Sequence, residues 1–260
     1  SPPEATSATV GLCDTGVAGG CAVGWANAAS LPRLQSDAAR VRVAWSGFGD
    51  AQSGVHNCSV SLHEMNSNGG GASVEVASAL LPCSPPGGEH QLEGLSLAES
   101  PVEYEARVVA YNGAGSGSIA VASAVLNIDA TPPDASGAVV SDLALLTPPY
   151  ADVDLRGVLV LPAVPTAVQL GCTWSNFTDA LSSIPEYRWA IVGRLASDWG
   201  DPLIPDAHVV ANWTATPQSI GGATANASVL QPLLLYKCAV EARDGAGSWS
   251  VPAYSDGWTF

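Results

Sequence analysis

The sequence has very little positive charge. It holds 9 lysine and arginine residues against 24 aspartate and glutamate residues, and Lys237 is its single lysine, so the formal net charge is −15. Phosphate backbones and anionic lipid surfaces repel such a chain, and we therefore expect no nucleic-acid partner and no electrostatic attachment to membranes. Long apolar runs are missing too, which excludes a transmembrane helix.

The chain also begins without an initiator methionine or an apolar leader. We therefore expect a mature fragment or an excised piece, with any signal or anchor outside it.

Motifs that carry catalysis or metal binding are equally scarce. The sequence has no Cys-x-x-Cys and no Gly-x-Ser-x-Gly, so neither a common zinc motif nor a nucleophile elbow is present. None of its histidines stands four residues from another, and each reads as a surface or satisfied core residue: His56, His63, His90 and His208. We expect no enzyme activity, no cofactor and no metal.

Four sequons and six cysteines stand out among the residues that are present. An even number of cysteines without metal spacing favours disulfides, and several sequons favour passage through the secretory pathway. We therefore expect an extracellular or cell-surface location. The predicted N-glycosylation sites are Asn57, Asn176, Asn212 and Asn226.

An internal repeat of about 130 residues organises the whole chain. Both copies hold a Pro-Pro pair, a Trp-Ser pair and a Gly-Ala-Gly-Ser turn in the same order. The matched segments are 2–5 with 132–135, 43–50 with 172–179, 104–108 with 236–240, 112–116 with 244–248, and 118–123 with 250–255. The sequence predicts two domains, 1–130 and 131–260, and indicates two units of a longer tandem array.

Period-two alternation of apolar residues predicts β-strands in both copies. Val41, Val43 and Trp45 fall on one face of a strand, and Tyr236, Cys238, Val240 and Ala242 fall on one face of another, opposite Lys237, Glu241 and Arg243. One buried and one wet face is typical of an antiparallel sheet over a core. The predicted fold class is all-β, with two tandem antiparallel β-sandwiches; segment 70–81 also fits a short helix, although its valines fit a strand as well.

Each repeat resembles a fibronectin type III or immunoglobulin-like domain. The resemblance is carried by a strand-B tryptophan (Trp45, Trp174) and by the motif Tyr-x-Ala/Cys-x-Val-x-Ala-x-Asn/Asp-Gly-Ala-Gly that starts at Tyr104 and Tyr236. It implies that these tyrosines hydrogen-bond backwards at the corner before strand F. Segments 13–36 and 143–165 depart from the family pattern, and the resemblance covers about two thirds of each copy.

The resemblance also implies a disulfide framework. Cys172 on predicted strand B and Cys238 on predicted strand F hold the inter-sheet positions of an immunoglobulin-type bridge, while copy one has Val43 and Ala106 there. Pairing within each repeat then leaves two local bridges, Cys13–Cys21 and Cys58–Cys83.

Acidic residues give two weaker alternatives to a purely structural chain. A glycosidase would need a carboxylate pair such as Asp152/Asp154 or Asp198/Asp201, but both pairs lie in loop sequence and neither recurs in the other copy. Asp129 and Asp134 flank the linker, where some adhesion arrays bind calcium, yet the sequence indicates too few oxygen ligands for that ion. The glycine-rich segment 113–117 reads as a turn.

The tryptophans fall into two groups, one predicted to pack in the core and one that could bind a ligand. Trp45 and Trp174 are predicted core residues, whereas Trp25, Trp199, Trp213 and Trp249 have no match in the other copy. Trp199 and Trp213 are candidate binding residues because exposed indoles stack on sugars, while Trp213 also lies inside a sequon and can pack beneath an attached glycan.

We expect a non-enzymatic structural or assembly repeat of a larger cell-surface or filament glycoprotein. Its partners would be neighbouring repeats or other copies, and the Pro-Pro linker predicts a stiff, extended joint. The composition, rich in Ala, Gly, Ser and Pro, resembles green-algal surface proteins, whose repeats build walls or filaments such as mastigonemes. The alternative is a module pair that recognises a glycan or a protein, which predicts exposed aromatic residues in one copy only.

Overall fold

A computed structural model describes residues 1–13, 33–65, 73–83, 87–143, 168–199, 208–225, 230–231 and 233–259. The chain divides into two compact units, Ser1–Thr131 (unit 1) and Pro132–Phe260 (unit 2). The regular elements of their described residues are β-strands apart from one 3-10 turn, so the predicted all-β fold class is confirmed. In the described part of the chain, no helix is long and apolar enough to cross a membrane.

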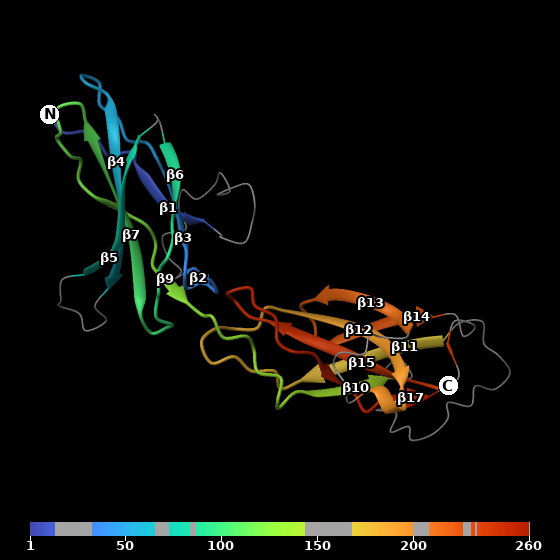
Figure 1. The fold of residues 1–260 in the computed structure, drawn as a ribbon. Helices are drawn as coiled ribbons and strands as arrows, with labels where there is room; N and C mark the ends of the chain where they lie inside the picture. The colour runs from blue at the N-terminus through green and yellow to red at the C-terminus, as the bar shows by residue number, and fades with distance from the viewer. Residues whose placement is uncertain are drawn as a thin grey trace. The chain divides into compact units, whose positions relative to one another are not determined.

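Unit 1 consists of a small and a large sheet (Figure 1). The small sheet has the order β1-β3-β6, from β1 (Thr9–Cys13), β3 (Val41–Ser46) and β6 (Gly87–Leu92). The large sheet has the order β2-β9-β7-β4-β5, with β8 also paired to β7. Its strands are β2 (Arg33–Gln35), β4 (Val55–Met65), β5 (Val74–Pro82), β7 (Glu103–Asn112), β8 (Val121–Ala122) and β9 (Leu126–Ile128). All pairs are antiparallel except β2 with β9.

Unit 2 repeats this plan. Its small sheet has the order β10-β11-β14, from β10 (Val139–Leu143), β11 (Val168–Ser175) and β14 (Ile220–Ala225). Its large sheet has the order β13-β12-β15-β16, with β17 also paired to β15. The strands are β12 (Glu186–Leu195), β13 (His208–Thr216), β15 (Leu234–Arg243), β16 (Ala253–Tyr254) and β17 (Trp258–Thr259), and the 3-10 turn η1 (Ala196–Asp198) follows β12.

The core of each unit lies between its two sheets. In β7 the burial alternates strictly, with Tyr104, Ala106, Val108 and Ala110 facing inward. Both predicted core tryptophans, Trp45 and Trp174, are buried within the cores of their units. Residues of β5 pack on the unit 1 core with the same period of two, so the described part of segment 70–81 is a strand and not a helix.

Both units contain the predicted tyrosine corner. The Tyr104 hydroxyl accepts a hydrogen bond from the Ala98 N–H at 2.8 Å. The Tyr236 hydroxyl accepts one from the Gln231 N–H at 2.7 Å. Each ring is buried, so this bond satisfies a polar group in the core and fixes the chain just before the strand.

Two of the predicted disulfides lie within the described residues. Cys172 on β11 is bonded to Cys238 on β15, which joins the two sheets of unit 2. Cys58 on β4 is bonded to Cys83, which follows β5 in the same sheet of unit 1. Cys13 is also disulfide-bonded, but its predicted partner Cys21 lies outside the described residues.

Candidate binding face

The outer face of the large sheet in unit 2 gathers cations and aromatic rings. Along β15, Tyr236, Cys238, Val240 and Ala242 point into the core, so the alternate residues of this strand face outward. On β12, Trp189 and Ile191 fill the core in the same way. The outward residues of the two strands are Arg188, Ala190, Val192, Arg194, Lys237, Ala239, Glu241 and Arg243.

Arg188 approaches two tryptophans at one end of this face. Its guanidinium carbon lies 5.1 Å from the centre of the Trp213 ring and 4.6 Å from that of Trp249. The same guanidinium forms a salt bridge with Glu241. Arg243 lies 5.7 Å from the Trp249 ring, and its guanidinium contacts the Glu186 carboxylate at 3.1 Å. Charge and ring contacts therefore hold these side chains in one layer.

Trp199 occupies the other end of the face. Its indole N–H donates to the Leu235 carbonyl at 3.2 Å, and its ring packs on the small apolar floor of Ala190, Val192 and Ala239. The Tyr254 ring meets it edge-on with centroids 5.3 Å apart.

Two cations lie close to the Trp199 ring, since Arg194 and Lys237 each come within 5.1 Å of its centre. Each such contact at an exposed site is worth about 0.5–1 kcal/mol. We call the set the cation–aromatic face: Trp199, Trp213, Trp249, Tyr254, Arg188, Arg194, Lys237 and Arg243.

At the described positions that the sheet registers match, unit 1 lacks the Tyr254 and Trp249 rings and the Lys237 ammonium. The matching sheet registers place Glu105 where unit 2 has Lys237, Ala122 where it has Tyr254, and Gly117 where it has Trp249. The cation–aromatic face is therefore a property of one copy, although both copies share the same sheet.

The outer face of the large sheet in unit 1 centres on His63. Its Nε2 lies 2.9 Å from the Ser61 hydroxyl, and the register places Glu75 and Glu105 opposite it on the two neighbouring strands. Burial lowers the pKa of His63 below its ordinary value of 6.5, and the Arg107 charge lowers it further against the opposing effect of the two glutamates.

In each unit, the turn after the central strand of the small sheet (β3 or β11) lies close to the turn after β7 or β15. The polar residues that meet there differ between the two units. In unit 1 the Asn112 amide donates to the Asp50 carboxylate at 3.1 Å, and that carboxylate also accepts the Gln52 and Ser53 N–H groups. These bonds, chiefly that from Ser53, lower the pKa of Asp50 to about 2.

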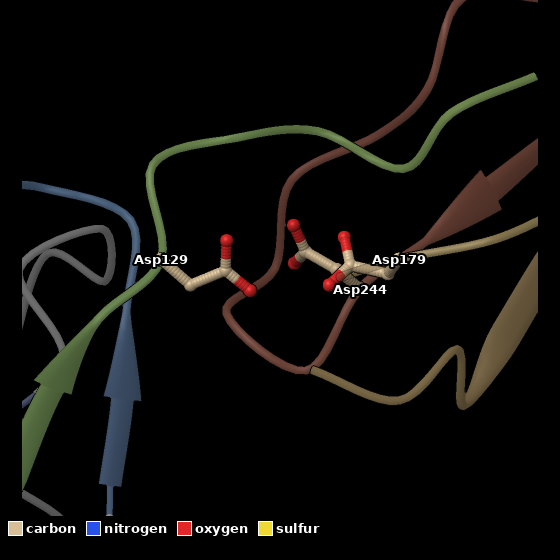
Figure 2. Close-up of side chains that lie close together, drawn as sticks. All are labelled: Asp129, Asp179 and Asp244. Atoms are coloured by element: carbon tan, nitrogen blue, oxygen red, sulfur yellow. The ribbon is translucent and has the colours of Figure 1, made fainter. Parts of the chain in front are cut away.

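In unit 2 the equivalent residues are Asp179 and Asp244, whose carboxylates face each other with oxygens within 4.8 Å (Figure 2). Asp179 accepts the Leu181 and Ser182 N–H groups, and Asp244 accepts the Ser248 N–H. Two carboxylates supply oxygen ligands of the kind that hard cations take, but fewer than the roughly six to eight that calcium requires.

The predicted linker acids are held by the chain around them. Asp129, also labelled in Figure 2, follows β9, and its carboxylate accepts the Thr131 hydroxyl at 3.1 Å. Asp134 accepts the Ser136 N–H at 2.7 Å and the Ser136 hydroxyl, which lowers its pKa.

Among the described residues, the structure places a depression in unit 2 and one of the carboxylates considered for a glycosidase. A shallow depression on the outer face of the small sheet of unit 2 is lined by Ser, Thr, Val, Ile and Trp side chains and by no titratable group. Asp198 lies in η1, where its carboxylate accepts the Ser197 hydroxyl. The other three carboxylates considered for a glycosidase, Asp152, Asp154 and Asp201, lie outside the described residues.

Three of the four sequon asparagines are described, and all three are exposed. Asn57 lies on β4 and Asn212 on the edge strand β13. Asn176 has a positive φ of 62° at the turn where unit 1 has Gly47 with φ 82°, a conformation that asparagine tolerates better than most residues. Asn226 lies outside the described residues.

Both candidate binding tryptophans belong to the cation–aromatic face, at its opposite ends. Trp213 is 42% exposed, and Trp199 is partly buried. Sequence reasoning did not find the role of Arg188, Arg194 or Tyr254. The alternation of the strands could have identified the two arginines. It already placed Lys237 and Arg243 on the solvent-facing side of one strand, and the same period applied to the neighbouring strand places Arg188 and Arg194 on that side.

No family model matches the chain. No curated protein matches it either. Among solved structures, it is similar to the fibronectin(III)-like modules of CbhA from Clostridium thermocellum, with a TM-score of 0.42 and 12% sequence identity over 96% of this chain and 93% of that one. The sandwich fold assigned to each unit rests on the sheet order, register and tyrosine corners described above.

Proposed function

We propose that the chain is a pair of non-catalytic extracellular modules whose role in a larger glycoprotein is structural: spacing, adhesion or assembly. The observation that carries this proposal is the duplication itself. Each unit is a β-sandwich with its own core and its own internal disulfide. A fold of this kind can serve many functions, so the function of this chain depends on the residues that its surfaces expose.

The disulfides and sequons support an extracellular location. Structural disulfides persist in oxidising compartments, and glycan attachment needs an exposed asparagine. Exposed Asn57, Asn176 and Asn212 meet that requirement. The resemblance of the composition to algal surface proteins extends the proposal to a cell-surface filament, in which other copies of the chain are the partners.

Sedimentation velocity over a wide concentration range tests the assembly role. We expect the secreted, oxidised chain to associate reversibly, with glycans on the three exposed asparagines in a peptide mass map. A chain that stays monomeric at the highest concentration would contradict assembly, and unoccupied sequons in secreted protein would contradict the glycoprotein assignment.

A second candidate function is recognition of a glycan or a protein by unit 2. The observation that favours it is the cation–aromatic face, which has no counterpart in unit 1. Trp199→Ala and Trp213→Ala are the test variants, and Ile119→Ala, at an exposed position of unit 1, is the control. Recognition predicts that cell or glycan binding is lost in the tryptophan variants while folding and the control remain normal.

A further inference from the structure

We propose that the cation–aromatic face of unit 2 docks on the outer face of unit 1 in a second copy of the chain. This inference rests on the assembly role proposed above and names its surfaces. The two copies of the repeat expose residues of opposite charge on the outer faces of their equivalent large sheets.

Basic residues are concentrated on the unit 2 face. The whole chain has 9 lysine and arginine residues, and four of them, Arg188, Arg194, Lys237 and Arg243, lie in this one layer. Lys237 forms no salt bridge with the described residues, and its ammonium contacts only the Trp199 ring among the aromatic rings described. Arginine and aromatic side chains are the residues most enriched at the centres of protein interfaces.

The equivalent face of unit 1 is acidic and apolar. Glu75 on β5 and Glu105 on β7 lie opposite His63, and Glu103 lies opposite Met65 at the end of β4. Arg107 lies on the same face and pairs with Glu105 at 2.6 Å, so three carboxylates stand beside one guanidinium. Glu75 is exposed and makes its described contact with a serine hydroxyl, that of Ser78.

An apolar edge runs beside these carboxylates. Strand β5 is the last strand of its sheet, and its side chains Val76 and Leu80 are 39% and 66% exposed. We call Glu75, Glu103, Glu105, Val76 and Leu80 the acidic–apolar face. Aliphatic side chains suit the indole and phenol rings of unit 2, and carboxylates suit its cations.

The complementarity follows from differences at two matched sites. Where unit 1 has Glu105, unit 2 has Lys237, and where unit 1 has Ala122, unit 2 has Tyr254. A contact between unlike faces is heterologous, so in a pair one copy keeps an unused acidic–apolar face, the other keeps an unused cation–aromatic face, and further copies can add. The net charge of −15 opposes approach over long distances, but at physiological salt charges beyond about 8 Å are screened and the local pairs dominate.

Charge reversal tests the pairing directly. We expect Lys237→Glu alone and Glu75→Lys alone to weaken self-association of the full chain by at least about tenfold, because like charges then meet across the interface. Mixing these two variants restores the opposite charges between one face of each, so heterodimers should form at near wild-type affinity. Arg40→Glu and Glu93→Lys change the net charge by the same amounts away from both faces and are the controls; neither should alter association.

The aromatic contribution has its own variant. Trp199→Ala should weaken association by about tenfold, while Ile119→Ala, at an exposed position outside both faces, should not. Circular dichroism and thermal melts confirm that each variant folds.

The outcomes separate the two proposals. A wild-type chain that never associates overturns the assembly role and this inference together. Association that survives Lys237→Glu, Glu75→Lys and Trp199→Ala overturns this pair of faces and leaves assembly standing. If Lys237→Glu and Glu75→Lys each fail to self-associate and also fail to associate with each other when mixed, the pairing of Lys237 with the acidic–apolar face is overturned.

Discussion

The bridge between the two sheets of unit 2 offers a stability test with a built-in comparison. Unit 1 has Val43 and Ala106 at the positions of Cys172 and Cys238, and all four side chains are fully buried. The double substitution Cys172→Val, Cys238→Ala therefore gives unit 2 the pair that unit 1 already accommodates. The substitution removes the cross-link and places in the core of unit 2 the same two side chains that the core of unit 1 holds at these positions.

The loop closed by this bridge sets the expected loss. The cysteines are separated by 66 residues, so in the chain-entropy account the bridge lowers the free energy of folding by about 4 kcal/mol. A domain of this size unfolds with an entropy of about 2.1 cal/mol/K per residue, so the melting temperature of unit 2 should fall by about 15 °C.

Differential scanning calorimetry of the full chain measures that shift, and the transition that stays in place belongs to unit 1. A decrease in the melting temperature of unit 2 of less than about 5 °C would refute the reasoning, because it would mean that the bridge does little to confine the unfolded chain. The reciprocal change, Val43→Cys with Ala106→Cys, should raise the melting temperature of unit 1 under oxidising conditions and have no such effect under reduction.

Three further changes test the cores and the outer face of unit 1. Gly221→Ala should destabilise unit 2 by about 1–3 kcal/mol in urea denaturation, because the new Cβ would lie 2.2 Å from the Trp189 ring; equal stability would contradict this packing. Tyr236→Phe should cost about 1–3 kcal/mol in the same assay, since it leaves a backbone N–H of the corner without its acceptor, and an unchanged midpoint would count against the corner. Burial and the neighbouring Arg107 lower the pKa of His63 in the folded state, against Glu75 and Glu105. The stability of unit 1 should therefore be retained above pH 6.5 and fall as the pH drops below it, and His63→Gln should flatten that dependence.

Much of the fold could be predicted because its signals are local and repeated. The alternation in β7 and β15 depends on a period of two, which any strand over a core imposes. The corner tyrosines and the Cys172–Cys238 bridge followed from a resemblance carried by the same strands.

The candidate faces could be predicted only in part. Trp199 and Trp213 were identifiable as unmatched aromatic residues, but their companions come from separate strands. The position of Trp213 over Arg188 depends on a shift of register between β12 and β13, where one strand bulges against the other. Composition and spacing do not encode that shift, because it arises from how the two strands settle on the core.

The amino-acid sequence alone determined that this protein is a doubled β unit with alternate residues buried. The period of two and the repeat of about 130 residues can be read from the sequence without knowing how the strands pack. Tertiary structure alone decided which charges and rings share a surface. Arg188, Trp213 and Trp249 are far apart in the sequence and meet because three segments of the chain are aligned side by side by backbone hydrogen bonds and a common core. Tertiary structure also gave the contrast between Lys237 and Glu105, because only the strand registers show that the two residues occupy equivalent outward positions in the two units.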